Sequence, residues 1–349
     1  MELRQVGDTG LLVSVIGLDC GFGGAADAGQ IADADAVHLM RCAYFKAISF
    51  FDSGDACDSR RTESMLGQFL KTVPRGEVQI GCKFGYDFSG APGEKGSYPA
   101  RKQDFSPAFL RTALEESLRR LGTDYIDLYM AQDIKLPQFG DDLFAELENV
   151  KRQGMIRAWG VSLGPEIGWR EEGFAAMLDH HASAVQTVFN LFEQNPGREI
   201  CELARSQHAA VLARGRIGRS IPQDTPTPGA STTPDDTAGR EHCLKKSLKV
   251  SRSAQARKMS LRQLECRWLL QQPGLASITA TLRTEGEITE AAESVEMPGL
   301  TQRELTELAT DYARDWGLGE AAHPRRLKSS VDASGSVRSR YVPPPTMLA

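Results

Sequence analysis

Two stretches, Phe51-Asp52-Ser53-Gly54-Asp55-Ala56-Cys57 and Gly81-Cys82-Lys83-Phe84, decide how the rest of the chain is interpreted. Each ends an apolar run that predicts a β-strand, and each places ionisable side chains where that strand stops. In a parallel α/β barrel the carboxyl ends of the strands carry the groups that do chemistry. These two stretches are therefore the first candidates for a functional site.

Eight apolar runs of strand length alternate with segments of helix length. The strand-like runs are residues 15–18, 48–51, 78–84, 125–130, 156–162, 184–190, 209–213 and 276–279. Apolar residues at three- and four-residue spacing predict helices at residues 34–47, 62–71, 107–121, 143–153, 174–180, 199–208 and 261–271. This alternation favours an α/β fold of the (β/α)8 TIM barrel type, with an open doubly wound sheet as the alternative.

The open sheet has one local motif in its favour. Gly21-Phe22-Gly23-Gly24-Ala25-Ala26 fits the loose Gly-x-Gly-x-x-Ala form of the dinucleotide fingerprint. Asp27-Ala28-Gly29-Gln30 follows before any helical pattern begins, so these glycines do not open a helix directly, whereas the motif requires that they do. A loop at a strand end is the preferred interpretation.

The two ends of the chain and one internal segment lie outside the alternation. Residues 3–15 are two short apolar segments around a Gly-Asp-Thr-Gly turn, which predicts an N-terminal β-hairpin. Residues 216–240 are rich in Pro, Thr, Asp and Gly and predict a long irregular loop on the active face. Residues 317–349 hold few apolar side chains and predict a mobile, disordered tail after one barrel domain at residues 1–316.

Composition excludes several classes of partner. With 41% hydrophobic and 25% charged residues, a chain of 349 residues can bury a sizeable core. A net charge of −5 argues against a nucleic-acid partner. The apolar runs are too short to span a membrane and the N-terminus lacks the apolar core of a signal peptide, so we expect a cytoplasmic protein without a membrane partner. Seven cysteines without a Cys-x-x-Cys pair predict free thiols and no metal site.

An ordered series of motifs along residues 1–316 resembles the aldo-keto reductase family. The resemblance is carried by Leu3-Arg4-Gln5-Val6-Gly7, Phe50-Phe51-Asp52-Ser53, Lys83-Phe84-Gly85-Tyr86, Leu118-Arg119-Arg120-Leu121-Gly122-Thr123-Asp124-Tyr125-Ile126-Asp127-Leu128-Tyr129, Trp159-Gly160-Val161-Ser162 and Val185-Gln186-Thr187-Val188-Phe189-Asn190. It implies a barrel that binds NADPH across its mouth and reduces the aldehyde or ketone of a small-molecule substrate by hydride transfer.

The resemblance also implies four catalytic positions, of which two have changed. The family's aspartate and lysine correspond to Asp52 and Lys83, whereas its tyrosine position is Cys57 and its histidine position is Gln132. A cysteine is acidic enough to donate a proton, but its thiol is shorter than a phenol. Beside Lys83 it could instead be a nucleophilic thiolate, or only a small packing residue. Gln132 can still donate a hydrogen bond to a carbonyl but cannot titrate, and Tyr86 is a further source of a phenol or a shield over the substrate.

The cofactor positions implied by the resemblance are also mixed. They are Ser162 and Gln186 for the carboxamide of the nicotinamide, Arg214 against its ring, Gly215 and Ile217 in the phosphate loop, and Arg283 for the 2′-phosphate. The family's asparagine after the serine is Leu163, and its Ile-Pro-Gly turn near the eighth strand has lost its glycine. We therefore expect a weakened NADPH site, with loss of cofactor binding as the alternative.

Three hypotheses follow for the function. The first is a reductase-like oxidoreductase that uses NADPH with atypical proton transfer through Gln132, Cys57 or water. The second is an enzyme on this fold that has abandoned hydride transfer for lyase, isomerase or thiol-dependent chemistry. The third is a non-catalytic binding protein. Cofactor binding separates the first from the other two.

Overall fold

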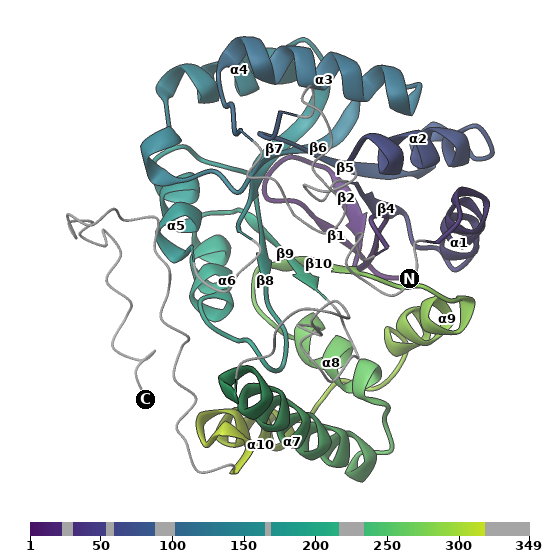
Figure 1. Ribbon diagram of the computed structural model, residues 1–349, viewed down its shortest axis with the longest axis vertical. Coiled ribbons are helices and arrows are strands. Elements are labelled where there is room, and N and C mark those ends of the chain that lie inside the picture. Colours follow the sequence, from purple (N-terminus) through teal and green to yellow (C-terminus); the bar gives the residue numbers. More distant parts are fainter. Residues whose placement is uncertain (23–30, 54–58, 88–101, 165–168, 216–233, 318–349) are drawn as a thin grey trace.

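The computed structural model describes residues 1–22, 31–53, 59–87, 102–164, 169–215 and 234–317 (Figure 1). Eight parallel strands close into a barrel in the order β10-β3-β4-β5-β6-β7-β8-β9. They are β3 (Ile16–Asp19), β4 (Phe50–Asp52), β5 (Gln79–Phe84), β6 (Ile126–Gln132), β7 (Ile156–Ser162), β8 (Ala184–Val188), β9 (Ala210–Gly215) and β10 (Leu275–Ala280). Each of the eight runs expected from the sequence forms one of these strands. The (β/α)8 barrel is confirmed and the open sheet is wrong.

Helices surround the barrel as an outer layer (Figure 1). They are α1 (Asp33–Phe45), α2 (Ser59–Leu70), α3 (Pro107–Leu121), α4 (Asp141–Arg152), α5 (Arg170–Leu178), α6 (Gly197–Ser206), α7 (Pro234–Ala256), α8 (Leu261–Leu270), α9 (Glu285–Ser294) and α10 (Gln302–Ala313). Local sequence explains where α3 begins and ends. The Ser106 side chain caps it by accepting from the Phe109 N–H, Pro107 occupies its first turn, and Gly122 ends it at φ 66°.

The N-terminal hairpin, β1 (Leu3–Gln5) with β2 (Leu12–Ser14), is also confirmed. Val6, Leu11 and Val13 are buried against side chains that fill the barrel, so the hairpin and the barrel interior share one apolar cluster. The Arg4 guanidinium donates to the carbonyl oxygens of Leu270 and Leu275 at 2.8 and 2.9 Å. The main core lies between the strands and the surrounding helices.

One predicted segment needs a correction. The irregular loop expected at residues 216–240 overlaps α7, so residues 234–240 are helical, while residues 216–233 lie outside the described residues. A proline is compatible with the first turn of a helix, where a backbone N–H is not needed, so the chain can begin α7 at Pro234. Gly317, the first residue of the expected tail, ends a short 3-10 helix (Asp315–Gly317), and the rest of that tail, residues 318–349, lies outside the described residues.

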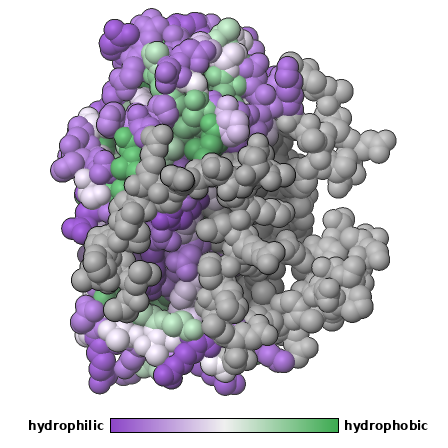
Figure 2. Space-filling model, turned by 90° about the vertical axis from the view of Figure 1, so that its left-hand side faces the viewer, coloured by the Kyte–Doolittle hydropathy of each residue, from purple (hydrophilic) through white to green (hydrophobic). Residues whose placement is uncertain are grey.

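The surface on the left-hand side of Figure 1 is mostly hydrophilic where it is described, with small hydrophobic areas between (Figure 2). Among the described residues, no helix combines the length and apolar character that crossing a membrane requires.

Because all eight strands are parallel, their carboxyl ends meet at one mouth of the barrel. The register pairs Asp19 with Asp52 and Asp52 with Gly81 on one side. On the other side it pairs Ser162 with both Gln132 and Gln186. The residues singled out at the strand ends are thereby collected at one face, which is where barrel enzymes do chemistry.

Candidate active site

A buried ion pair forms the centre of the mouth. Asp52 ends β4 and Lys83 lies one residue before the end of the neighbouring strand β5. The Lys83 ammonium donates to both carboxylate oxygens of Asp52 at 2.8 Å and to the carbonyl oxygen of Ser53 at 3.1 Å. The two side chains are only 4% and 6% exposed. Neither charge has much access to water, so each depends on the other.

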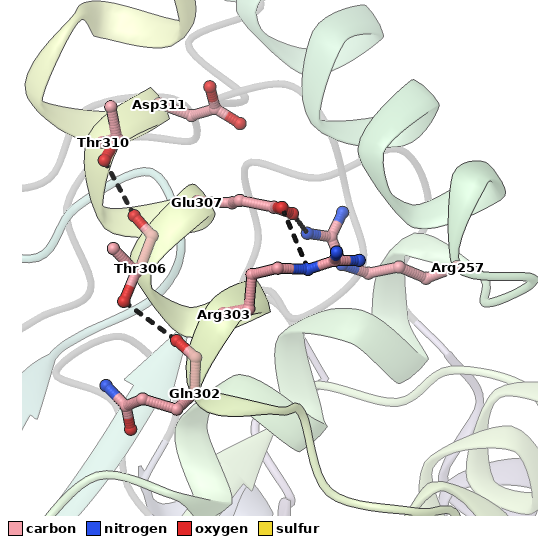
Figure 3. A pocket seen from close by; sticks show the side chains of 7 residues that line it. All are labelled: Arg257, Gln302, Arg303, Thr306, Glu307, Thr310 and Asp311. Atoms are coloured by element: carbon pink, nitrogen blue, oxygen red, sulfur yellow. Dashed lines mark hydrogen bonds and ion pairs between the residues drawn. The ribbon is translucent and has the colours of Figure 1, made fainter.

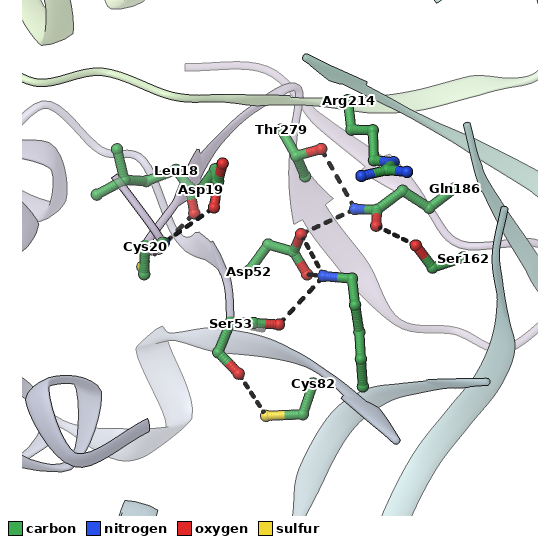
Figure 4. Close-up of polar contacts among 12 residues, drawn as sticks. Leu18, Asp19, Cys20, Asp52, Ser53, Cys82, Ser162, Gln186, Arg214 and Thr279 are labelled. Carbon is green, nitrogen blue, oxygen red and sulfur yellow. Dashed lines mark hydrogen bonds and ion pairs between the residues drawn. The ribbon is translucent and has the colours of Figure 1, made fainter. Parts of the chain in front are cut away.

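Two further predicted residues join this pair in one network (Figure 4). The Gln186 amide N–H donates to Asp52 Oδ2 at 2.8 Å, and its carbonyl oxygen accepts from the Ser162 hydroxyl at 2.9 Å. The same amide nitrogen lies 3.3 Å from Thr279 Oγ1. Strands β4, β5, β7, β8 and β10 therefore all contribute to one polar network.

Burial sets the electrostatics of the pair. It raises the pKa of the Asp52 carboxyl, and the Lys83 ammonium and the Gln186 amide pull that pKa back down. The carboxylate of Asp19, one strand away, raises it further. Because it is buried, the Asp52 carboxylate keeps its charge only while the Lys83 ammonium lies beside it. In turn, Asp52 fixes the position of the Lys83 ammonium through two hydrogen bonds.

Gln132 and Asp133 lie beside this network, at the end of β6. Gln132 is 7% exposed, and its side chain makes no hydrogen bond within the described part of the chain. Asp133 is 5% exposed, and its φ of 54° is a left-handed conformation that is uncommon for residues other than glycine. Asp133 Oδ2 accepts from the Tyr86 hydroxyl at 2.8 Å, whereas its Oδ1 is buried and has no hydrogen-bond partner among the described residues.

The Asp133 carboxyl has a perturbed pKa. Burial raises the pKa, while the Arg214 guanidinium, the Tyr86 hydrogen bond and the Lys83 ammonium lower it. A carboxyl with this combination of burial and specific charged neighbours in a barrel mouth is typical of groups that handle protons. The Tyr86 phenol bonds to this carboxylate rather than to Lys83.

Arg214 connects the ends of β9 and β7. Its NH2 group donates to the carbonyl oxygens of Leu163 and Gly164 at 2.8 and 2.7 Å. Its Nε atom is buried without a hydrogen-bond partner among the described residues. Gly215 follows at φ 137°, a conformation open to glycine.

The remaining predicted positions are placed as follows. Arg283 is half-buried in the segment between β10 and α9, and its backbone N–H donates to the Glu287 carboxylate at 2.6 Å. Cys57 and Ile217 lie outside the described residues. Cys82 faces away from Lys83, as alternation on a strand requires. Its sulfur lies 3.1 Å from Ser53 Oγ, and burial raises the pKa of its thiol well above the usual value, so it is a packing residue.

The mouth presents two complementary orphaned atoms. Arg214 Nε is a donor and Asp133 Oδ1 is an acceptor, and the guanidinium acts on the pKa of the carboxyl. A carboxamide, which carries one acceptor and two donors, can satisfy both. The residues present therefore fit the nicotinamide end of NADPH, even though Gln186 and Ser162 already bond to each other and Leu163 has no polar side chain.

Sequence reasoning missed the role of Asp133 and Thr279. Asp133 follows directly after a strand, the same signal that singled out Asp52, so the rule of ionisable residues at strand ends could have found it. The Thr279 hydroxyl donates to the Ala213 carbonyl oxygen at 3.0 Å and supports the Gln186 amide. That contact depends on the pairing of β9 with β10, which carries no local signal.

A cavity of about 590 Å³ lies elsewhere, against α10 on the outside of the barrel (Figure 3). Glu307 bridges Arg257 at 2.9 Å and Arg303 at 3.5 Å along its wall. The lining side chains come from α10 and from the residue that follows α7, and none comes from a barrel strand. This cavity is therefore separate from the barrel mouth and from the chemistry there.

A closed barrel of eight parallel strands with a lysine and aspartate pair at its mouth is an arrangement found in the aldo/keto reductases. The Aldo/keto reductase family model matches residues 19–310, and the chain belongs to this family. The series of motifs quoted for the resemblance is thereby supported over most of the chain.

Three curated proteins illustrate the relationship. The Glycine max protein "Probable aldo-keto reductase 1" is 28% identical over 219 residues, which cover 62% of this chain and 60% of that protein. The uncharacterized oxidoreductase YqkF of Bacillus subtilis is 24% identical over 319 residues, covering 90% and 98% of the two chains. The L-galactose dehydrogenase of Arabidopsis thaliana is 25% identical over 327 residues, covering 88% and 93%.

Two solved structures share the fold. The holo form of an aldo-keto reductase from Bacillus halodurans superposes with a TM-score of 0.72 at 23% identity, covering 89% of this chain and 96% of that one. A glycerol dehydrogenase from Gluconobacter oxydans gives 0.73 at 24% identity, covering 92% and 97%. At these identities the likeness concerns the fold alone.

Proposed function

We propose that this protein is an oxidoreductase that reduces a carbonyl group of a small molecule with NADPH and transfers the proton in an atypical way. The observation that carries the proposal is the Lys83–Asp52 pair, which is buried at the barrel mouth and tied to Gln186 and Ser162. Burying two charges costs several kcal/mol of desolvation each, so the pair is poor as a stabilising device alone. Membership of the aldo/keto reductase family supports the class of reaction.

The residues of this chain would divide the work between cofactor and substrate. Ser162, Gln186 and Arg214 would hold the nicotinamide end, Gly215 and Ile217 would belong to the phosphate loop, and Arg283 would bind the 2′-phosphate. NADPH, when bound, supplies the hydride. Lys83 places a fixed positive charge where negative charge grows on the carbonyl oxygen, which is the usual source of electrostatic stabilisation in an enclosed site.

The proton-handling groups are assigned from geometry. Gln132 has an amide N–H with no partner among the described residues, and this group can donate to the carbonyl oxygen. Asp133 and Tyr86 form a hydrogen-bonded pair of titratable groups within the same mouth, and the pKa of Asp133 is shifted upward toward the range useful for proton transfer. Cys57 or a water molecule is the alternative donor.

A second function has one observation in its favour. The Gln186 amide is bonded to Asp52 and Ser162 at both ends, and the neighbouring side chain is the apolar Leu163. The mouth keeps the Lys83 ammonium and the Oδ1 of Asp133, which is unpaired among the described residues, whereas Ser162 and Gln186, the groups expected to bind a carboxamide, bond to each other. This arrangement suits acid–base chemistry without hydride transfer. A lyase or isomerase reaction that uses Lys83 and Asp133 is therefore the alternative.

The test is a titration with NADPH followed by a kinetic assay. NADPH should quench the tryptophan fluorescence with saturation, and a probe carbonyl such as 4-nitrobenzaldehyde should be reduced at a measurable rate. Lys83→Met and Gln132→Leu should each lower kcat by about 10²-fold or more, since each removes a group that acts on the carbonyl oxygen. His208→Ala, at an exposed site far from the mouth, serves as the matched control.

The outcomes separate the hypotheses. If no quench is seen with NADPH in large excess, the reductase proposal is wrong. If turnover of any substrate without NADPH then depends on Lys83, the second function takes its place. Absence of both would leave a binding protein. Circular dichroism of each variant checks that the fold is intact, and Gln132→Leu provides a variant that breaks no bond within the described chain.

A further inference from the structure

A second group of chemically reactive side chains lies outside the barrel mouth, between α1 and α9. His38 and Cys42 are four residues apart on α1, which places them on one face of the helix. Glu285 is the first residue of α9, after the capping residue Thr284. The two helices adjoin each other on the outside of the barrel (Figure 1). The potential ligand atoms of the three side chains all lie within 4.8 Å of one another.

A single nitrogen atom contacts both other groups. His38 Nε2 lies 2.8 Å from Glu285 Oε1 and 3.5 Å from Cys42 Sγ. One hydrogen on Nε2 can point at only one of these two atoms. Hydrogen bonds alone therefore cannot pair His38 with Glu285 and Cys42 at the same time through a single N–H. A cation at their centre would accept an electron pair from all three.

The spacing suits a tetrahedral ion. Zinc bonds to histidine nitrogen at 2.0–2.1 Å and to thiolate sulfur at 2.3 Å, which puts nitrogen and sulfur about 3.6 Å apart across a tetrahedral edge. The observed separation of 3.5 Å already matches. The edge between nitrogen and oxygen would be about 3.4 Å, so the Glu285 oxygen must move outward by about 0.6 Å. Its side chain is 66% exposed and has room to do so.

The kinds of ligand select the metal. Thiolate, imidazole and carboxylate together favour zinc over the hard cations magnesium and calcium, which prefer oxygen ligands. A thiolate and a carboxylate also balance the charge of a divalent ion. Three protein ligands would leave the fourth position to water, and the 59% exposed His38 side chain shows that the position faces solvent.

We propose that His38, Cys42 and Glu285 form a zinc site that joins α1 to α9. These helices follow β3 and β10, the first and last strands of the barrel, which pair with each other where the barrel closes. Bound zinc would connect residues 247 positions apart across this seam and stabilise the folded chain by mass action. No sequence motif points to the site because its third ligand comes from the far end of the barrel.

Cadmium is the direct probe, because a thiolate bound to it gives a charge-transfer band in the ultraviolet. Chelator-treated full-length protein should show this band with saturation near one equivalent of Cd²⁺, and Zn²⁺ should abolish it by competition. Cys42→Ser should remove the band. His38→Ala and Glu285→Gln should weaken the apparent affinity for Zn²⁺ by about tenfold or more, since even changes beyond the ligands typically cost that much.

Two controls make the result specific. Cys57→Ser and Cys243→Ser test the two cysteines whose side chains lie outside the described residues, and both variants should keep the band. His208→Ala removes another exposed histidine that faces a carboxylate, Asp8 at 3.7 Å, without a cysteine beside it, and it should bind zinc as the unmodified chain does. Zinc should also raise the thermal unfolding midpoint of the unmodified chain but not that of Cys42→Ser.

Three results would overturn the proposal. They are a band that survives in Cys42→Ser, the absence of any band at several equivalents of cadmium, and an unfolding midpoint that zinc raises equally in Cys42→Ser. The metal-free stability of all three ligand variants should stay close to that of the unmodified chain. His38 and Glu285 are exposed, and half-buried Cys42 exchanges only its sulfur for an oxygen in Cys42→Ser, so each substitution should cost little stability. Misfolding would therefore not imitate loss of the site.

Discussion

Lys83 and Asp52 depend on each other because both charges are buried at the barrel mouth. Removing one partner of such a pair leaves the other charged and unpaired in a place that water hardly reaches. The structure gives Asp52 one more donor, the Gln186 amide, and that neutral group replaces only part of the ammonium. The stability of the mouth and its chemistry are thus linked through the same two residues.

The first prediction concerns this pair. Lys83→Met should lower the free energy of unfolding by about 3–5 kcal/mol, because Asp52 is left without its counterion. The double variant Lys83→Met with Asp52→Leu should recover a large part of that loss, since no buried charge remains. Urea unfolding followed by circular dichroism measures both. Equal stability of the single and double variants would contradict the argument.

The second prediction concerns the pH dependence given by Asp133. Its pKa is raised in the folded chain, so the folded state holds the proton more tightly than the unfolded state. The stability that this carboxyl contributes is present below its ordinary pKa of about 3.9 and is lost as the pH rises through the raised value. Asp133→Asn does not titrate. It should therefore gain in stability relative to the unmodified chain as the pH increases from about 4 toward neutrality.

Unfolding free energies at a series of pH values test this. Asp52 and Glu63 also have raised pKa values, but they are present in both proteins, so their contributions cancel in the difference. Tyr86→Phe removes a hydrogen bond that lowers the Asp133 pKa, so the pH at which stability is lost should shift upward. This prediction is wrong if the difference in unfolding free energy between Asp133→Asn and the unmodified chain does not change with pH. Asp133 would then have the same pKa in the folded and unfolded states.

At the scale of elements, the two ends of the barrel strands have different tasks. At the amino end of β6, Asp127 is fully buried and accepts from Arg75, from Arg157 and from the backbone N–H of Ile80 at 2.8–3.0 Å. It connects β5, β6 and β7 at the end of the barrel away from the mouth. At the carboxyl end of the same strand, the side chain of Gln132 makes no hydrogen bond to the described residues, whereas its backbone carbonyl oxygen accepts one from Gln103.

The third prediction follows from this difference between the amino and carboxyl ends of β6. Asp127→Asn should lower the free energy of unfolding by about 1.5–3 kcal/mol, because charge-assisted hydrogen bonds to two arginines are lost. It should leave NADPH affinity and turnover unchanged. Gln132→Leu should do the opposite on the same strand, with a large loss of kcat and little change in stability. The pair is measured by urea unfolding and by the carbonyl reduction assay, and equal effects on both readouts would contradict it.

The strands and most helices could be predicted because their periodicity is local. Apolar runs and three- and four-residue spacing reflect which faces are buried, and a barrel buries both faces of every strand. The start of α7 could not be predicted in the same way. Its first turns follow a segment rich in Pro and Thr, whose composition favours a loop. Among the described side chains of α7, the buried apolar ones, Val250 and Ala254, come only in its later turns.

The candidate site could be predicted in its members but not in its contacts. Asp52, Lys83 and Ser162 are expected at strand ends and Gln186 is expected at the site from the family resemblance, and the barrel brings the four together. The sequence does not say that Gln186 bonds to Asp52, because that contact spans the barrel between residues 134 positions apart. Nor does it say that Tyr86 turns to Asp133. Side-chain directions in loops after strands depend on packing that no local pattern records.

At the scale of the whole molecule, the barrel interior is closed by the N-terminal hairpin. Val6, Leu11 and Val13 belong to the same cluster as Phe50 and Leu128, which fill the barrel, and this cluster is separate from the core beneath the helices. The inner cluster lies within the ring of strands whose carboxyl ends carry the site. Its packing therefore supports the strands on which Asp52, Lys83 and Gln132 are placed.

The last prediction compares two adjacent leucines of the hairpin. Leu11 is 1% exposed and Leu12 is 47% exposed, so the same truncation tests burial at nearly the same point of the chain. Leu11→Ala should lower the free energy of unfolding by about 2–5 kcal/mol, because it opens a cavity among apolar side chains that cannot collapse freely. Leu12→Ala should change it by no more than about 0.5 kcal/mol. If the hairpin unfolds together with the barrel, the slope of the unfolding free energy against denaturant concentration should be the same in Leu11→Ala as in the unmodified chain. Only the denaturant concentration at the midpoint should fall. A separate early transition in Leu11→Ala would instead show that the barrel is stable without its hairpin.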